Sequence, residues 1–301
     1  MNHVESFLEV LKNKYPYYAR VPYRLYKEGD AEYLAFAEMV TSQLLQQGKE
    51  AEQVVEAYAQ MSTDYLRLQK ELEETGRYHY QTFEEAKRHV YDNEKVMRGY
   101  YLDGLILSQI WWPNHYRIYR FFIDVFLNSM PETGLVCEVG PGHGLFTATF
   151  LRNKPNWRLL AYDTSEFSIA YTSNWISHTP GTTSENYSLI HEYSGEGMKK
   201  RGDQFDSIIC GEVLEHLEDP LSFLRNLIEY AKPEAVFYLT TAMYAANIDH
   251  LYLFHSADEV RELINESGLQ IIEEEVLPVN ESDSINDTDV PMNYVCTARI
   301  Q

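Results

Sequence analysis

Three glycines at two-residue spacing follow a short apolar run near the middle of the chain. Gly140, Gly142 and Gly144 come directly after residues 135–139 and before a segment with helical spacing. Glycine tolerates positive φ angles and lets the backbone approach a ligand closely, while the start of a helix presents free amide donors. The pattern predicts a ligand-binding loop between a strand and a helix; a tight structural connection is the alternative.

A dinucleotide-binding loop has a different glycine spacing. Its third glycine would stand at position 145, where this chain has Leu145, so the spacing here is Gly-x-Gly-x-Gly. A nicotinamide-dependent oxidoreductase is therefore a weaker alternative.

An aspartate follows the next apolar run. Asp163 comes directly after residues 158–162, 19 positions after Gly144, at the expected tip of a second strand. A carboxylate in this position can accept hydrogen bonds from both hydroxyls of a ribose. It can also cap a helix that begins near Thr164, and the two roles are compatible.

A third element runs from residue 205 to residue 220 and combines a strand, a short loop and the start of a helix. Together with Glu138, the glycine loop and Asp163, this segment resembles the motif set of class I S-adenosylmethionine-dependent methyltransferases. The resemblance is greatest to small-molecule enzymes related to those of quinone biosynthesis. It covers roughly residues 134–301, including the later segments 247–250 and 254–256, and is absent from the first 130 residues.

The resemblance implies S-adenosylmethionine as cofactor and S-adenosylhomocysteine as product. The glycine loop would pass under the methionine and ribose, and Asp163 would bind the ribose. The adenine would lie near Ser194, although many relatives have Asp-Ala where this chain has Ser194-Gly195. His216 is expected to stabilise its loop. The expected cofactor-binding residues are Glu138, Gly140, Gly142, Gly144, Asp163, Thr164, Ser194, Gly211 and Glu212.

Methyl transfer from a sulfonium is an in-line displacement, so the protein must align the acceptor and, where needed, remove a proton. Candidate bases are His250 and His255 after the fifth strand, and His115 before the sheet; a structural role is the alternative for each. We expect no metal, because no carboxylate cluster with ligand spacing accompanies His250 and His255.

Tyrosines are concentrated in the first part of the chain, where they either line a pocket or pack the helices together. Residues 100–115 come just before the sheet, so we expect them to form a lid or an acceptor wall, with Gly104 and Pro113 as hinges. The expected acceptor-binding residues are Tyr101, Trp112 and Tyr244.

The elements that must position these residues differ between the two parts of the chain. Apolar residues at three- and four-residue spacing predict helices over 31–45, 54–72 and 83–97, and Thr82 with Glu85 makes a capping-box pattern. After Pro131, five short apolar runs alternate with helical segments, which predicts a parallel sheet. The five predicted strands are residues 135–139, 158–162, 187–191, 205–210 and 235–240.

Two further runs, 269–279 and 294–300, are joined without a helix and predict an antiparallel pair. The expected fold is therefore α/β: a doubly wound, Rossmann-like sheet of about seven strands with a C-terminal antiparallel hairpin, preceded by a helical N-terminal domain. The expected domain boundaries are 1–130 for the helical region and 131–301 for the methyltransferase domain. The helical region would serve in substrate recognition, in docking or as a lid.

Composition excludes several partners. The 301 residues include 25 Lys and Arg against 46 Asp and Glu, a formal charge of −21, which disfavours nucleic acid and anionic membranes. Glu5 and Glu9 interrupt the first apolar stretch, so we expect no secretory signal, no membrane span and a cytoplasmic location. The three cysteines are expected to be core thiols, and the N-terminal helices offer a surface for a homodimer.

The sequence thus predicts transfer of a methyl group from S-adenosylmethionine to an oxygen or nitrogen of a small-molecule acceptor. Two alternatives remain: methylation of a protein or carrier-tethered substrate docked on the N-terminal helices, and a non-catalytic cofactor-binding scaffold.

Overall fold

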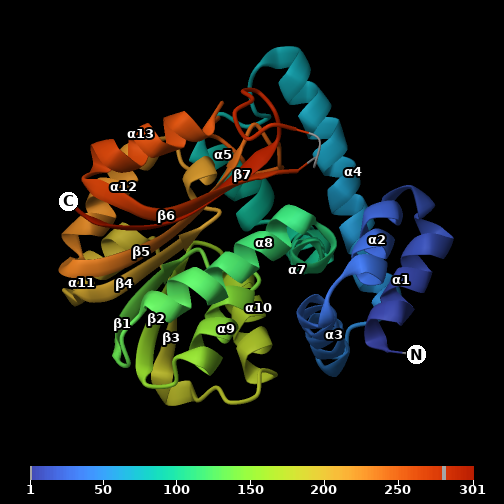
Figure 1. Ribbon diagram of the computed structural model, residues 1–301, viewed down its shortest axis with the longest axis horizontal. Coiled ribbons are helices and arrows are strands. Elements are labelled where there is room, and N and C mark those ends of the chain that lie inside the picture. Colours follow the sequence, from blue (N-terminus) through green and yellow to red (C-terminus); the bar gives the residue numbers. More distant parts are fainter. Residues whose placement is uncertain (1, 280–282) are drawn as a thin grey trace.

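The computed structural model describes residues 2–279 and 283–301. Within them, one sheet carries helices on both faces, and the N-terminal helices extend the molecule to one side (Figure 1). The strands are β1 (Gly134–Val139), β2 (Trp157–Asp163), β3 (Tyr187–His191), β4 (Phe205–Gly211), β5 (Ala231–Met243), β6 (Leu269–Pro278) and β7 (Met292–Ile300).

The sheet has the order β3-β2-β1-β4-β5-β7-β6, and the first five strands are parallel. β7 runs antiparallel between β5 and β6. The predicted doubly wound sheet of seven strands with an antiparallel C-terminal pair is confirmed. The order of the first strands reverses beside β1, where an open α/β sheet forms its ligand-binding crevice.

The two faces of the sheet follow from strict alternation along the strands. Val136 and Leu159 face one hydrophobic cluster, whereas Cys137 and Leu160 face another. Figure 1 shows the helices on the two sides. They are α9 (Leu145–Asn153) and α10 (Glu166–Ser177) with the N-terminal helices on one face, and α11 (Ser194–Arg201), α12 (Pro220–Glu229) and α13 (Ala257–Ser267) on the other.

The N-terminal region is helical, as predicted. Its helices are α1 (His3–Lys14), α2 (Arg20–Glu28), α3 (Ala31–Gln46), α4 (Ala51–Thr75), α5 (Phe83–Ala86), α6 (Glu94–Val96), α7 (Leu102–Trp111) and α8 (Pro113–Phe121). The predicted helix over 83–97 is interrupted at residues 92–93; before them a π-helix (Lys87–Tyr91) continues directly from α5. At the interruption the Asn93 side chain accepts a hydrogen bond from the amide of Lys95, and such local bonds compete with a continuous helix.

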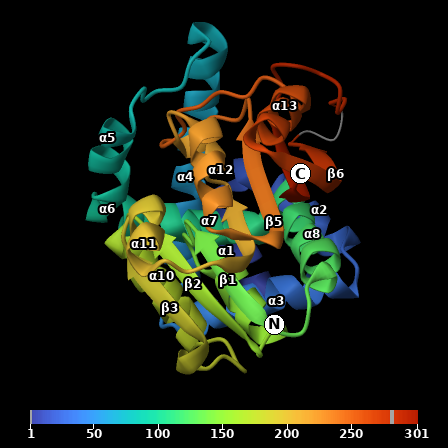
Figure 2. The same cartoon turned by 90° about the vertical axis from the view of Figure 1, so that its left-hand side faces the viewer.

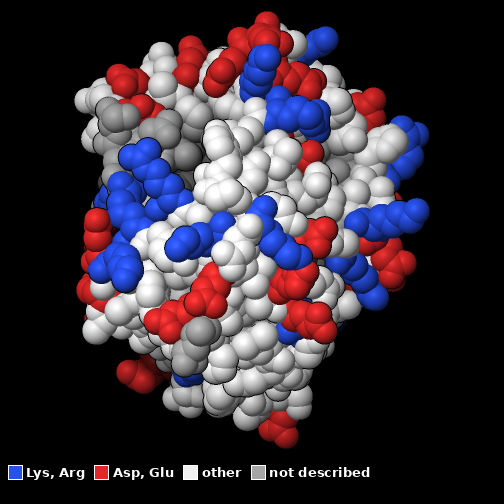
Figure 3. Space-filling model, turned by 90° about the vertical axis from the view of Figure 1, so that its right-hand side faces the viewer, with Lys and Arg blue, Asp and Glu red and all other residues white. Residues whose placement is uncertain are grey.

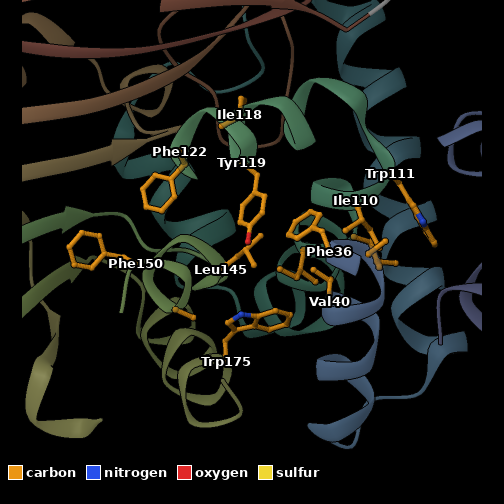
Figure 4. Packing of buried hydrophobic residues seen from close by; sticks show 14 of the residues in the cluster. Phe36, Val40, Ile110, Trp111, Ile118, Tyr119, Phe122, Leu145, Phe150 and Trp175 are labelled. Atoms are coloured by element: carbon orange, nitrogen blue, oxygen red, sulfur yellow. The ribbon is translucent and has the colours of Figure 1, made fainter. Parts of the chain in front are cut away.

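The hydrophobic core is continuous between the N-terminal helices and the sheet (Figure 4). The ring of Phe36 on α3 stacks on Tyr119 of α8 with centroids 4.0 Å apart. The buried Gln43 side chain donates to the Trp175 carbonyl of α10 at 2.7 Å. The helices therefore share their apolar contacts with the sheet region rather than forming a separate core.

The expected hinges of residues 100–115 have other roles in the structure. Gly104 lies inside α7, where an added Cβ would be 2.9 Å from the Cβ of Met61 on α4. The glycine therefore allows two helices to cross closely. Pro113 is the first residue of α8, a position that proline favours.

Charge is unevenly distributed over the surface. On the face that carries the N-terminal helices, lysines and arginines gather beside acidic residues (Figure 3). Exposed basic residues of α1 and α2 include Lys12, Lys14, Arg20 and Lys27. The repulsion of anionic partners expected from the total charge therefore does not apply equally to every face.

Two further expectations drawn from the composition concern membrane spans and cysteines. Among the helices of the described residues, none combines the length and apolar character needed to cross a membrane. Cys137, Cys210 and Cys296 are buried free thiols, as predicted.

The shared core predicts that damage to α3 destabilises the whole chain. We expect Phe36→Ala to lower the free energy of unfolding by about 3–5 kcal/mol, because it leaves a cavity beside Tyr119. Tyr17→Ala, at a ring that is 78% exposed, should change it by less than about 0.5 kcal/mol. Urea titrations followed by circular dichroism and tryptophan fluorescence test this; separate transitions for the two probes would contradict a single core.

Candidate active site

The glycine loop connects the buried end of β1 to the start of α9. Gly140, Gly142 and Gly144 all have positive φ angles, of 67°, 55° and 76°. At Gly144, an added Cβ would lie 2.8 Å from the Cα of Thr172 on α10, so α9 and α10 approach there as only glycine permits. The predicted loop conformation is confirmed.

Asp163 lies at the end of β2 beside this loop. Its Oδ2 accepts a long hydrogen bond of 3.4 Å from the Gly142 amide, and its Oδ1 accepts one of 2.8 Å from the Ser165 amide. Burial raises the pKa of Asp163 to about 6, although the two amides act in the opposite direction. The carboxylate is thus held against the glycine loop with lone pairs left to bind hydroxyl groups.

Several buried polar atoms near the loop have no partner among the described residues. They include Oε2 of Glu138 on β1 and Oγ of Ser194 at the start of α11. Buried polar groups are normally hydrogen-bonded, so unpaired ones in a cleft indicate a ligand. These atoms, the glycine loop and Asp163 fit a cofactor with amino, ribose and base groups.

Two cavities meet at the glycine loop. One contains Asp163, Thr164 and Ser194 and extends to Phe83 at the start of α5. Figure 2 shows α5 and α6 on the same side of the molecule as α10 and α11. The other lies between the sheet and the N-terminal helices α4, α7 and α8. Both are lined by Tyr101, Leu105, Val139, Gly140, Gly142, Glu212 and His216. The two cavities therefore adjoin at these residues.

Residues 83–91 cover part of the first cavity, a role that was not predicted from the sequence. The Ser165 hydroxyl donates to the Tyr91 carbonyl at 2.9 Å, and the Phe83 amide donates to Oε1 of Glu218 at 2.7 Å. Tyr91 and Phe83 both line the cavity. Residues 83–91 therefore lie over the cofactor side, whereas residues 100–115 line both cavities, at Tyr101 and Leu105, and form a wall of the second one.

The second cavity is largely apolar and aromatic. Its walls include Tyr65, Trp112, Phe146 and Tyr238. The Trp112 indole donates to the Tyr58 hydroxyl at 2.9 Å, which fixes the orientation of its ring. This environment suits a small molecule with an apolar or aromatic body.

The structure brings together two of the three expected acceptor-binding residues. Tyr101 and Trp112 line the second cavity, and the Tyr101 hydroxyl donates to Oδ2 of Asp249 at 2.6 Å. Tyr244 is not among the residues that line either cavity; its carbonyl accepts a hydrogen bond from Gln69.

Two of the three candidate bases also line this cavity. They are His250 and His115, and burial lowers the pKa of each to about 3, so both are neutral near pH 7. His255 is 47% exposed, contacts Asp289 and lies outside both cavities. The position of His255 therefore does not suit a catalytic role.

Two carboxylates lie together at the floor of the second cavity. Oε2 of Glu215 accepts from the Thr241 hydroxyl at 2.8 Å, and Oε2 of Glu212 accepts from the Asn293 amide at 2.7 Å. Burial raises the pKa of Glu212 well above its usual value, and repulsion by the neighbouring Glu215 adds to this; burial also raises the pKa of Glu215. Glu212 has a φ of 52°, a strained value for a non-glycine residue.

The carboxylates adjoin two histidines. Ligand-type atoms of Glu215, His216 and His250 all lie within 4.8 Å of one another. The expectation that no carboxylate cluster accompanies His250 is therefore wrong, because folding places the 212–216 loop against the segment after β5. Glu215 and His216 belong to the segment that carried the family resemblance, but their proximity to His250 is not encoded in local spacing.

Other lining residues were not singled out from the sequence. They include Gln109, Asn114, His143, Asn247 and Asn293. Asn114 on α8 donates to Asn293 on β7 at 2.7 Å, across 179 positions of sequence. Such pairs follow from tertiary contact and leave no periodic signal.

Comparison with known proteins agrees with this geometry. Residues 137–237 match the sequence profile of a methyltransferase domain family. A ubiquinone biosynthesis O-methyltransferase from Dinoroseobacter shibae is 27% identical over 130 residues, which cover 36% of this chain and 52% of that protein. One from Ruegeria pomeroyi is 28% identical over 124 residues, or 34% and 50% of the two chains. The matches thus span about half the length of these relatives.

Two solved structures share the fold at low sequence identity. An O-methyltransferase family protein from Burkholderia thailandensis has a TM-score of 0.53 at 13% identity, covering 81% of this chain and 71% of that one. The mitomycin 7-O-methyltransferase MmcR has a TM-score of 0.54 at 12% identity, covering 83% and 70%. Because these shares exceed the length of residues 131–301, the similarity extends into the N-terminal helices.

The unpaired Glu138 carboxyl generates a prediction about pH. Burial raises its pKa from 4.5 to about 7, so the folded chain holds this proton to a higher pH than the unfolded chain does. Stability from this group is therefore full below about pH 4.5 and is lost as pH rises through about 7. As the pH rises from 4.5 to 8, we expect the free energy of unfolding of Glu138→Gln to increase relative to that of wild type by up to about 3 kcal/mol. Urea titrations of the two ligand-free proteins across this pH range measure this. A difference in free energy of unfolding that does not change with pH would show that the pKa of Glu138 is not raised.

Proposed function

We propose that this chain, whose residues 137–237 form an S-adenosylmethionine-dependent methyltransferase domain, transfers a methyl group to an oxygen of a small-molecule acceptor. One observation carries the proposal: the cavity with the predicted cofactor residues meets an aromatic cavity at the glycine loop and Glu212. The names of the matching relatives, which are O-methyltransferases, favour oxygen over nitrogen.

The cofactor would be held by the residues at the ends of β1, β2 and β4. Asp163 would accept from the ribose hydroxyls and Ser194 would lie near the base. Glu138, which lines the second cavity beside the glycine loop, would face the cationic amino group. When bound, S-adenosylmethionine supplies an electrophilic methyl group on a sulfonium sulfur. The positive charge of such a ligand would offset the buried carboxylates of Glu138 and Glu212.

The acceptor would lie against Trp112 and Phe146, with its reacting oxygen directed towards Glu212 and His250. The aromatic walls exclude water and restrict the orientation of a flat molecule, which favours an in-line approach. Neutral His250 and the carboxylates at the cavity floor are the groups available to take the acceptor's proton.

We expect Asp163→Asn to weaken S-adenosylmethionine binding by roughly 10–100-fold, because charge-assisted hydrogen bonds to the ribose would be lost. Asp124→Asn, at a half-exposed carboxylate that pairs with Arg120 on the surface, should leave the dissociation constant unchanged. Calorimetric titration with S-adenosylmethionine and S-adenosylhomocysteine measures both. An unaltered dissociation constant in Asp163→Asn would remove the cofactor assignment.

The acceptor site has its own test, in which phenols and other small hydroxyl compounds are screened for formation of S-adenosylhomocysteine. With an acceptor found in this way, Trp112→Ala should raise its KM by about tenfold while leaving cofactor binding intact, because about 1–1.5 kcal/mol of aromatic contact is lost. Tyr17→Ala removes an exposed ring and serves as the control. Unchanged kinetics in Trp112→Ala would place the acceptor elsewhere.

The same screen separates the alternative functions. Cofactor binding without turnover of any free acceptor, but with turnover of a carrier-tethered one, would favour docking on the N-terminal helices. Binding without turnover of either kind would favour a non-catalytic scaffold.

A further inference from the structure

We propose that the Asp249 carboxylate, together with the phenol groups of Tyr91 and Tyr101, recognises the positive charge of the cofactor's sulfonium. The site would then bind S-adenosylmethionine more tightly than S-adenosylhomocysteine. All three side chains line the cofactor cavity. This inference rests on the proposed function, which requires the cofactor's sulfur to lie where the two cavities adjoin.

Asp249 lies on the cofactor's side of that junction. Of the described residues that line the cavities, Tyr101 and Glu212 belong to both, whereas Asp249 belongs to the cofactor cavity alone. The Tyr101 hydroxyl donates to Oδ2 of Asp249 at 2.6 Å. The carboxylate is therefore held next to the place where a methyl group would pass from one cavity to the other, and an acceptor in the second cavity would not cover it.

The Asp249 side chain is buried, and one of its oxygens is unpartnered. The residue is 2% exposed, and Oδ1 has no hydrogen-bond partner among the described residues. Nδ1 of His216 lies 3.6 Å from Oδ1, beyond hydrogen-bonding distance, and is 3.0 Å from the Asp249 carbonyl oxygen instead. Such a carboxylate oxygen is costly in a folded protein unless a ligand satisfies it.

The cofactor cavity offers no lysine or arginine that could offset this charge. Its described lining includes four acidic residues, which are Asp163, Glu192, Glu212 and Asp249, and neither of the two strongly basic residue types. Buried carboxylates are normally paired with a cation or fully hydrogen-bonded. The cavity therefore favours a ligand that brings positive charge.

Two single-turn π-helices bring the tyrosines to this carboxylate. One comprises Lys87–Tyr91 and the other Met97–Tyr101, so each of them ends at one of the two tyrosines. Turns of this kind are rare and occur frequently at functional sites. Nδ2 of Asn247 donates to the Tyr101 hydroxyl oxygen at 3.3 Å, so the hydroxyl's own proton is directed to Asp249.

Tyr91 approaches the same carboxylate from the segment that covers the cofactor cavity. Burial, and then the charge of Asp249, raises the pKa of Tyr91 well above its usual value, and the same two causes raise the pKa of Tyr101. Both phenols therefore stay protonated near pH 7, and Asp249 contributes the negative charge of the group. Aromatic rings beside a carboxylate form a favourable environment for a cation.

This environment matches the chemistry of a sulfonium better than that of an ammonium partner within the protein. The charged sulfur carries no hydrogen, so it is attracted by negative charge and aromatic rings without donating a hydrogen bond. Methyl transfer converts it to the neutral thioether of S-adenosylhomocysteine, and the attraction to Asp249 is then lost. The proposed contact would therefore hold the substrate form of the cofactor and favour release of the product form.

The test measures binding of three ligands to the full chain by calorimetry. They are S-adenosylmethionine, S-adenosylhomocysteine and the analogue in which a CH–NH₃⁺ group replaces the S⁺–CH₃ group. Asp249→Asn keeps an oxygen for the Tyr101 hydroxyl but removes the charge. It should weaken binding of the two ligands charged at this position by about tenfold and that of S-adenosylhomocysteine by less than about twofold.

Asp163→Asn is the matched control, because it removes a carboxylate of the same cavity on the ribose side. It should weaken binding of all three ligands by a similar factor. An equal loss for all three ligands in Asp249→Asn would overturn the proposal, since it would show that Asp249 only maintains the shape of the cavity.

Wild type alone gives a second readout that does not depend on a variant that folds. The ammonium analogue and S-adenosylhomocysteine both lack the sulfonium methyl group and differ in charge, so the analogue should bind at least about fivefold more tightly. Equal binding of these two ligands would refute the recognition of charge and leave the proposed function in place. No binding of any of the three ligands would refute the cofactor assignment, and this proposal with it.

Discussion

The parallel register of β1 with its two neighbours is the constraint on which this site depends. Val139 pairs with Tyr162 on β2 and with Cys210 on β4, so the three strands end at one level. Whatever follows each strand must then emerge at the same edge of the sheet. The glycine loop, Asp163 and Glu212 are distant in sequence, yet this alignment alone brings them around one space.

The N-terminal helices complete that space and belong to the same hydrophobic core as the sheet. α7 and α8 pack on the sheet through the same apolar cluster that contains the interior of β1 and α9. The aromatic wall of the acceptor cavity is thus continuous with the hydrophobic core, and its side chains are fixed by packing on their far sides. A binding surface supported in this way is preorganised, which lowers the entropy lost when a ligand binds.

The parts of the structure that could be predicted from the sequence are those encoded locally. The Gly-x-Gly-x-Gly loop and Asp163 each follow a short apolar run, so alternation and glycine chemistry were enough to place them. The cluster around Glu215 and His250 was missed because its members come from two segments that are distant in sequence and meet through the β4–β5 pairing and direct hydrogen bonds, such as that from the Leu251 amide to the Glu215 carbonyl. Tyr244 was placed wrongly because its backbone turns at a φ of 49° just after β5. The predicted helix over 83–97 is broken only at residues 92–93, where Asn93 favours a turn over a continuous helix.

The position of β7 has a consequence for how the chain is made. A ribosome releases β5 and then β6 before β7, yet β7 lies between them and supplies hydrogen bonds to both. During synthesis each of the two earlier strands presents an open edge, the kind of surface that recruits other chains. The nascent protein therefore has a period of vulnerability that ends only when β7 inserts. Asn293 arrives with that strand, so the acceptor cavity is among the last features to mature.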